Sequence, residues 1–227
     1  MKKKGFFLKE VFPGVFSEGR RLFTKNLVAG KRVYGEQLIT FGNIEYRQWQ
    51  PMRSKLAAAI IKGLKELPLK KGSNVLYLGS SEGTTASHIS DITGETGIIF
   101  GVDISETAMR RFVELCEERE NIVPVLADAA KPPEYKEYLR ETEIDLLYQD
   151  IAQKNQAEIF NKNAEMFLKK KRHGLIAIKA KSISQMRKAK EIFQAETSKL
   201  KEQFEILQTI PLEPFEKDHV MVSCRKK

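Results

Sequence analysis

A glycine-containing turn at residues 79–83 is the part of this sequence best suited to binding a small ligand. It follows an apolar run at residues 75–78 and leads into a helix-like segment that begins at Thr84 and Thr85. A buried strand that ends in such a turn and continues into a helix is typical of a doubly wound nucleotide-binding sheet. The glycines allow a tight turn, and the start of the helix offers unpaired N–H groups to a polar ligand.

Asp103 is a second residue that could contact this ligand. It follows the apolar run at residues 98–102, and a carboxylate at the end of the second strand can accept hydrogen bonds from a ribose diol. The two glycines of the turn are spaced G-x-x-x-G, so the dinucleotide fingerprint G-x-G-x-x-G is absent. This spacing favours S-adenosylmethionine, an adenosyl donor without a pyrophosphate, over a dinucleotide. The alternative for the turn alone is an ordinary βαβ connection that binds no ligand.

Three further charged residues lie where an open α/β sheet binds its ligands, at the carboxyl ends of its strands. Asp128 follows the third strand-like run, Asp150 follows the fourth, and Lys179 lies inside the fifth. A lysine inside an apolar segment is costly unless it is paired, so Lys179 is the most suggestive single residue. Considered singly, Asp128 could be a turn residue and Asp150 a helix cap.

Alternating strand-like and helix-like segments must position these residues. The strand-like runs are at 75–78, 98–102, 122–126, 144–148 and 175–180, and the helix-like segments are near 84–92, 105–118, 155–169 and 186–203. This alternation predicts parallel βαβ units with right-handed crossovers. Residues 204–212 and 219–224 have no helix between them and are expected to pair as antiparallel strands. The layout predicts the S-adenosylmethionine-dependent methyltransferase fold, an α/β Rossmann-like fold with a mostly parallel seven-stranded sheet and an antiparallel final strand.

Residues 1–50 differ in pattern from the rest of the chain. Short apolar runs punctuated by glycines predict a small antiparallel β domain, with a hairpin tip at residues 41–44. Residues 51–227 are then expected to form the methyltransferase domain. Its first element is predicted to be a helix over residues 54–67, capped by Ser54 and stopped by Pro68 and Gly72.

The composition argues against several classes of protein. No apolar run approaches the ~18 residues of a membrane span, and the apolar patch after Met1 and its lysines is too short for a signal peptide, so a cytoplasmic protein is expected. The two cysteines, Cys116 and Cys224, match no zinc spacing, and we expect no metal site. The formal net charge of +9 favours a polyanionic partner such as nucleic acid.

Several longer segments carry a resemblance to a known family. They are residues 31–34, 54–64, 76–79, 83–85, 118–122, 155–158, 176–180 and 213–221. On these segments, which extend over nearly the whole chain, the sequence resembles fibrillarin, the ribose 2′-O-methyltransferase family of box C/D guide-RNA particles, in its short archaeal form. The Gly/Arg-rich amino-terminal extension of the eukaryotic form is missing, which favours an archaeal, cytoplasmic protein over a nucleolar one.

The resemblance implies an enzyme that transfers a methyl group from S-adenosylmethionine to ribose 2′-hydroxyls of rRNA and tRNA, at sites specified by box C/D guide RNA, in pre-rRNA and tRNA processing. The implied partners are the guide RNA, the target RNA, a Nop-family scaffold protein and a kink-turn-binding ribosomal-type protein, with no membrane. The amino-terminal β region is a candidate docking site for the scaffold. Two alternatives stay open: a methyltransferase that acts on a protein or small-molecule acceptor, and a non-catalytic scaffold subunit of a ribonucleoprotein.

The resemblance also assigns a catalytic tetrad around the acceptor hydroxyl, namely Lys55, Asp150, Lys179 and His219. In this assignment Lys179 orients or deprotonates the 2′-hydroxyl, Asp150 holds Lys179, and the other two complete the hydrogen-bond network. The donor site implied by the turn and the resemblance comprises Gly79, Gly83, Thr84, Thr85, Asp103, Ile104, Asp128, Ala129, Asp150, Ile151, Ala152 and Gln153. Singly, Lys55 could be the solvated edge of a helix and His219 a structural histidine.

The sequence departs from the family pattern at four places. Glu82 stands where a small residue is expected, Asp103 where glutamate is usual and Lys154 where proline is usual, and residues 169–173 replace a glycine-rich turn. A group of basic residues follows the fifth strand and comprises Lys179, Lys181, Arg187, Lys188 and Lys190. They are either an RNA-phosphate surface beside the acceptor or the exposed start of a helix.

Overall fold

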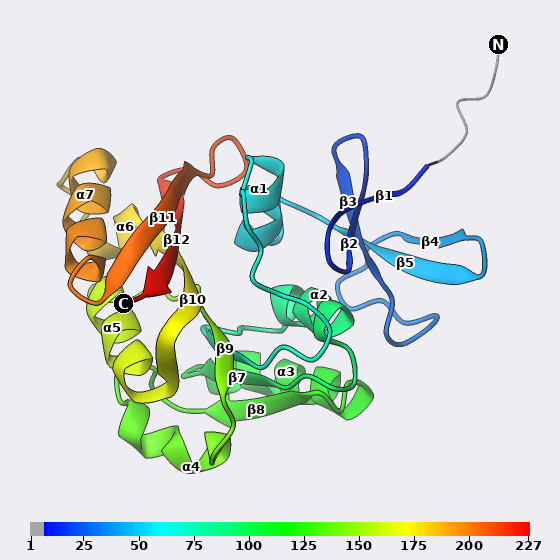
Figure 1. Ribbon diagram of the computed structural model, residues 1–227, viewed down its shortest axis with the longest axis horizontal. Helices are drawn as coiled ribbons and strands as arrows, with labels where there is room; N and C mark the ends of the chain where they lie inside the picture. The colour runs from blue at the N-terminus through cyan, green and yellow to red at the C-terminus, as the bar shows by residue number, and fades with distance from the viewer. Residues whose placement is uncertain (1–6) are drawn as a thin grey trace.

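The computed structural model describes residues 7–227, and these residues form two separate β-sheets (Figure 1). The amino-terminal sheet is antiparallel, with strand order β1-β2-β3-β5-β4. Its strands are β1 (Lys9–Phe12), β2 (Val15–Glu18), β3 (Arg21–Lys25), β4 (Leu38–Phe41) and β5 (Ile44–Trp49). The predicted hairpin tip joins β4 to β5, where Gly42 has a φ of 63°. The antiparallel β region is confirmed, and the domain boundary after residue 50 stays a prediction.

The second sheet has seven strands in the order β11-β12-β10-β9-β6-β7-β8. They are β6 (Val75–Leu78), β7 (Ile99–Asp103), β8 (Ile122–Leu126), β9 (Ile144–Gln149), β10 (Leu168–Lys179), β11 (Phe204–Pro211) and β12 (His219–Lys226). The five strands from β10 to β8 are parallel, and β12 runs antiparallel to both of its neighbours. The predicted mostly parallel sheet with an antiparallel final strand is therefore confirmed.

Helices cover both faces of this sheet. The four helices expected between the strands are α2 (Thr84–Thr93), α3 (Glu106–Glu118), α5 (Gln156–Phe167) and α7 (Ala189–Leu200). Three short pieces were not predicted: η1 (Pro132–Tyr135), α4 (Lys136–Leu139) and α6 (Ala180–Ile183). Among residues 7–227, no helix is long and apolar enough to cross a lipid bilayer.

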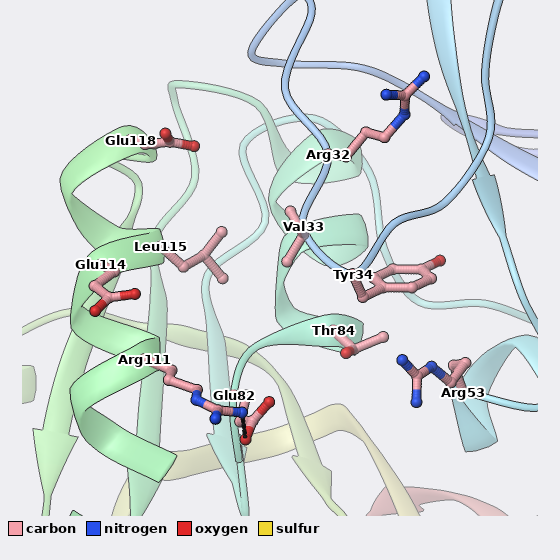
Figure 2. A pocket seen from close by; sticks show the side chains of 10 residues that line it. All are labelled: Arg32, Val33, Tyr34, Arg53, Glu82, Thr84, Arg111, Glu114, Leu115 and Glu118. Atoms are coloured by element: carbon pink, nitrogen blue, oxygen red, sulfur yellow. Dashed lines mark hydrogen bonds and ion pairs between the residues drawn. The ribbon is translucent and has the colours of Figure 1, made fainter. Parts of the chain in front are cut away.

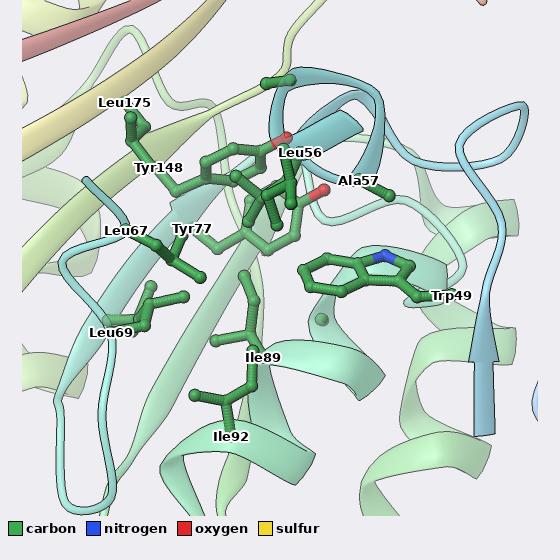
Figure 3. Close-up of a cluster of buried hydrophobic side chains, with 14 of the residues drawn as sticks. Trp49, Leu56, Ala57, Leu67, Leu69, Tyr77, Ile89, Ile92, Tyr148 and Leu175 are labelled. Carbon is green, nitrogen blue, oxygen red and sulfur yellow. The ribbon is translucent and has the colours of Figure 1, made fainter. Parts of the chain in front are cut away.

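The hydrophobic core lies in two layers because successive strand residues point to opposite faces of a sheet. Tyr77 of β6 packs in the layer with α1, α2 and α3, whereas its neighbour Leu76 packs in the layer with α5. Figure 3 shows the first layer, in which Tyr77 meets Tyr148 of β9 edge to face at a ring-centroid distance of 4.7 Å. The packing of β6 and β9 in the core therefore holds the carboxyl ends of these two strands in place.

The helix predicted over residues 54–67 is shorter than expected. Helix α1 spans Lys55–Ile61, with Ser54 as the predicted N-cap. Gly63 has a φ of 93°, and the N–H groups of Gly63 and Leu64 donate to the carbonyls of Ile60 and Ala59. This is a Schellman motif, which ends a helix at a glycine in the left-handed region. The expected stops at Pro68 and Gly72 are therefore wrong, because the earlier glycine ends the helix first.

Strand β10 begins seven residues before the predicted start at residue 175. Leu168 pairs with Ile144 and His173 pairs with Leu146, so β10 advances five residues while β9 advances two. The extra residues bulge outward, and Lys171 takes a φ of 66°. The segment expected to replace a glycine-rich turn is therefore an irregular, bulged start of the strand.

A buried ion network joins the amino-terminal sheet to the second sheet's helices. The guanidinium of Arg47 on β5 lies 2.9 Å from Glu36 and 3.0 Å from Asp91 of α2. Asp91 also forms an ion pair with Arg119, just after α3, with its Oδ1 2.7 Å from the guanidinium of Arg119. All four side chains are almost completely buried. This network fixes β5, and hence the chain that leads into α1, against α2.

Candidate active site

Two adjoining cavities lie at the carboxyl ends of the parallel strands. We call them the β10-side cavity, of about 320 Å³, and the β7-side cavity, of about 370 Å³. Both are lined by Gly79, Ser81, Asp150, Ile151 and Ala152. The β10-side cavity is further lined by Arg53, Lys55, Tyr77, Ser80, Glu82, Thr84, Thr85 and Lys179. The β7-side cavity is further lined by Val102, Asp103, Ile104, Ala127, Ala129 and Gln153.

Gly79 lets the ends of β6 and β9 approach closely at the junction of the two cavities. Its φ is 82°, and a Cβ atom there would lie 2.3 Å from the carbonyl oxygen of Asp150. The N–H of Asp150 donates to the carbonyl of Leu78 at 2.9 Å. A side chain at position 79 would therefore displace Asp150 from the cavities.

The loop between β6 and α2 is held by Asp103 and by packing on α3. One carboxylate oxygen of Asp103 accepts from the N–H of Ser81 at 2.8 Å, and the other accepts from the N–H of Ser105 at 2.9 Å. Gly83 has a φ of 92°, and a Cβ atom there would lie 2.3 Å from Leu115. Each oxygen of Asp103 keeps acceptor capacity for a ligand hydroxyl, because a carboxylate has about four lone-pair sites.

Lys55, the first residue of α1, reaches Asp150 across the β10-side cavity. Its Nζ lies 2.9 Å from Oδ2 of Asp150, and both side chains are 19% exposed. Ser54 positions this end of the helix, because its Oγ accepts from the N–H of Ala57 at 3.4 Å and from the hydroxyl of Thr85 at 2.9 Å. The ion pair of Asp150 is thus formed with Lys55. The expected direct pairing of Asp150 with Lys179 is not formed within the described part of the chain.

Lys179 ends β10 and lines the same cavity as Lys55 and Asp150. In the antiparallel register it lies opposite His219, the first residue of β12. Gln156 of α5 accepts from the backbone N–H of Lys179 at 2.9 Å and so fixes the strand end. His219 is buried; its Nδ1 lies 2.7 Å from the carbonyl of Lys217, and its Nε2 has no hydrogen-bond partner among residues 7–227.

The four residues of the expected tetrad therefore lie at one edge of the sheet, although His219 lines neither cavity. Two expected donor-site residues, Gly83 and Asp128, also line neither cavity. Gly83 packs against α3, and Asp128 accepts from the N–H of Ala130 at 2.9 Å and from the amide of Gln153 at 3.4 Å. Asp128 thus closes a turn and orients Gln153, while Ala129 and Gln153 line the β7-side cavity.

Sequence reasoning missed two lining residues of the β10-side cavity, Arg53 and Tyr77, and placed Ser80, Ser81 and Glu82 only within the turn at residues 79–83. Tyr77 was missed because it belongs to an apolar run of the sequence. Burial raises the pKa of its hydroxyl well above the ordinary value, so the hydroxyl stays protonated. Arg53 carries a signal that could have been used, because it stands two residues before Lys55. Ser81 and Glu82 form the tip of the turn between the two glycines.

A larger cavity of about 580 Å³ adjoins the β10-side cavity. Figure 2 shows it between α3 and the segment that carries Arg32, Val33 and Tyr34. It shares Arg53, Glu82 and Thr84 with the β10-side cavity. In this view Glu114 and Glu118 of α3 lie at the far side from Arg53.

Comparison with known proteins identifies related sequences over almost the full length. Residues 4–227 match the family model described as Fibrillarin. A protein of Thermococcus sibiricus named fibrillarin-like rRNA/tRNA 2′-O-methyltransferase is 47% identical, with 96% of this chain and 98% of that protein covered. A protein of the same name from Methanocaldococcus jannaschii is 48% identical, with 94% of each covered.

Solved structures give the same result. A Methanococcus jannaschii fibrillarin described as a pre-rRNA processing protein has a TM-score of 0.93 and 46% identity, with 99% of each chain covered. Aeropyrum pernix fibrillarin, solved with natively bound S-adenosyl-L-methionine, has a TM-score of 0.84 and 43% identity, with 92% of each chain covered. The fibrillarin chain of a fibrillarin/Nop5p complex has a TM-score of 0.88 and 40% identity; 96% of this chain and 100% of that chain are covered.

Proposed function

The chain belongs to the fibrillarin family, and from this premise we propose that it transfers a methyl group from S-adenosylmethionine to ribose 2′-hydroxyls of rRNA and tRNA. The observation that carries the proposal is the position of Asp150. Its carboxylate lies at the junction of the two cavities, is paired with Lys55 at 2.9 Å, and shares the β10-side cavity with Lys179. This arrangement can hold a cationic methyl donor and an incoming hydroxyl side by side.

The residues present suit an adenosyl donor. The β7-side cavity has an apolar lining from Val102, Ala127 and Ala129, and Ile104, which is 61% exposed, lines it as well. These groups fit an adenine ring, and Asp103 fits a ribose diol. Because Gly79 lets the ends of β6 and β9 approach closely, Asp150 stays at the junction of the two cavities, from which a larger residue would displace it. When bound, the donor supplies an activated methyl group on a positively charged sulfur.

The four residues at this edge of the sheet have separate tasks in the transfer. Asp150, held by Lys55, presents negative charge where the donor is positive. Lys179 meets the 2′-hydroxyl and orients it or takes its proton, and His219 supports the end of β10 on which Lys179 stands. Alignment of the hydroxyl with the methyl group supplies much of the rate, since positioning alone can contribute ~7–11 kcal/mol.

The same proposal assigns the partners. A relative forms a complex with Nop5p, so a Nop-family scaffold is the partner proposed for this chain. A box C/D guide RNA and a kink-turn-binding protein complete the proposed particle. The net charge of +9 and the exposed Lys181, Arg187 and Lys188 after β10 support contact with RNA near the acceptor site. Base pairing with the guide RNA then selects the target nucleotide.

The test is methylation by a particle assembled from this chain, its scaffold partners and a guide RNA of defined sequence. Mass spectrometry of the digested target should identify a single 2′-O-methylated nucleoside at the position specified by the guide. Methylation of a protein or a small molecule instead would identify a different acceptor. No calorimetric binding of S-adenosylmethionine at millimolar concentration would identify a non-catalytic subunit.

A further inference from the structure

Glu82 stands at the tip of the loop between β6 and α2, where it lines both the β10-side cavity and the larger cavity beside it (Figure 2). Its carboxylate lies 2.6 Å from the guanidinium of Arg111 on α3. The two side chains are 50% and 65% exposed. An ion pair this exposed contributes little to stability, so Glu82 can exchange this partner for another at small cost.

Only two carboxylates, Asp150 and Glu82, line the β10-side cavity within the described residues. Asp150 is already paired with Lys55. Glu82 is therefore the carboxylate left to meet a positive group that lies on the α2 side of this cavity. The other acidic residues nearby do not compete, because Glu114 and Glu118 line the larger cavity and not the β10-side cavity.

Arg53 faces the same junction from the opposite side. It too lines both cavities, and it forms no ion pair with another residue of the described chain. Its guanidinium carbon lies 6.0 Å from the centre of the Tyr34 ring, which supports its side chain without neutralising it. Beside it α2 begins at Thr84, and the first N–H groups of a helix of this length attract negative charge.

The methyl donor has one end that matches this pair of opposite charges. With the adenosine in the β7-side cavity and the reacting methyl group beside Asp150, the amino-acid end of the donor extends toward Thr84. That end carries an α-carboxylate and an α-ammonium. We propose that Arg53, with the start of α2, binds the α-carboxylate and that Glu82 binds the α-ammonium. The inference rests on the proposed function and adds a charge clamp, built from Arg53 and Glu82, on the amino-acid end of the donor.

Three ligands separate the two contacts. S-adenosylhomocysteine has both charged groups, decarboxylated S-adenosylhomocysteine keeps only the ammonium, and 5′-methylthioadenosine has neither. Calorimetry should show that Glu82→Gln weakens the binding of S-adenosylhomocysteine and of its decarboxylated form by about 3- to 5-fold and leaves the binding of methylthioadenosine unchanged. Arg53→Gln should weaken the binding of S-adenosylhomocysteine by about 5- to 10-fold and leave the binding of both other ligands unchanged.

Two matched controls make the result specific. Glu114→Gln removes the same charge from the same larger cavity, and Arg111→Gln removes the present partner of Glu82; neither should weaken any of the three ligands. The clamp is wrong if Glu82→Gln or Arg53→Gln leaves S-adenosylhomocysteine binding unchanged, or weakens it no more than methylthioadenosine. Absence of binding of all three ligands to the unaltered chain would instead contradict the proposed function.

Discussion

Lys179 and His219 are direct cross-strand neighbours at the carboxyl edge of the second sheet, the last residue of β10 opposite the first of β12. This pairing puts a half-buried lysine on the cavity and a buried histidine behind it. His219 anchors the following strand through the carbonyl of Lys217. The position of Lys179 therefore depends on the register of β10 with β12.

His219→Ala should slow methyl transfer without changing donor binding, because His219 lines neither cavity yet supports the strand end that carries Lys179. A shift of about 1 Å at a reacting group can cost on the order of 10²-fold in rate. Single-turnover kinetics and calorimetry with S-adenosylhomocysteine separate the two effects. His173→Ala, at the other end of the β10 and β12 pairing, is the matched control and should keep the full rate.

Gly79→Ala should both destabilise the protein and abolish donor binding. The added Cβ atom would lie 2.3 Å from the carbonyl oxygen of Asp150, in addition to the strain of a φ of 82°. A left-handed alanine costs about 1–2 kcal/mol by itself, and the clash adds to that. Gly42→Ala is the matched control, because Gly42 has a φ of 63° and nothing within 4 Å of its Cβ position. Equal losses of unfolding free energy in urea for both variants would contradict the close approach.

Asp91→Asn should destabilise the protein by about 3–5 kcal/mol, because it leaves the buried guanidinium of Arg119 without a counter-charge and leaves Arg47 with Glu36 alone. Glu82→Gln breaks an exposed ion pair of similar length and should cost less than about 1 kcal/mol. Denaturant melts of the two variants give both values. A loss below about 1 kcal/mol for Asp91→Asn would show that the network does not hold the two sheets together.

Stability should fall in mild acid because of His88. Burial, followed by the charges of Arg47 and Arg119, lowers the pKa of His88 well below its ordinary value. The unfolded chain therefore binds a proton near pH 6.5 that the folded chain does not. The stabilising contribution is complete above that pH and is lost as pH falls below it, by at most about 1.4 kcal/mol per pH unit. In His88→Gln the dependence of the unfolding free energy on pH between about 5 and 6.5 should flatten.

The parts of the fold set by local pattern could be predicted from the sequence. The turn at residues 79–83 and the start of α2 follow from an apolar run, two glycines and a helical period, which act over neighbouring residues. The predicted end of α1 is wrong because Gly63 precedes Pro68 in the chain, and a left-handed glycine ends a helix by itself. The conformation of one residue, Gly63, therefore determines where the helix ends.

Contacts between distant segments could not be predicted. Lys55 and Asp150 are 95 residues apart in sequence. No periodicity indicates that the partner of Asp150 is Lys55 and not Lys179. The buried network of Glu36, Arg47, Asp91 and Arg119 was missed for the same reason. Charged residues in a sequence are usually read as exposed, and their burial depends on partners that only the packing of the two sheets brings together.

The most direct test of the proposed mechanism is single-turnover methylation of the guide-specified RNA by Lys179→Ala, Asp150→Asn and the double variant, each in an assembled particle. The proposed mechanism predicts that either change slows transfer by about 10²- to 10⁴-fold while the particle still assembles. It also predicts that the double variant is no slower than the single variants, because the two side chains act at one shared cavity. Full activity in either single variant would contradict it.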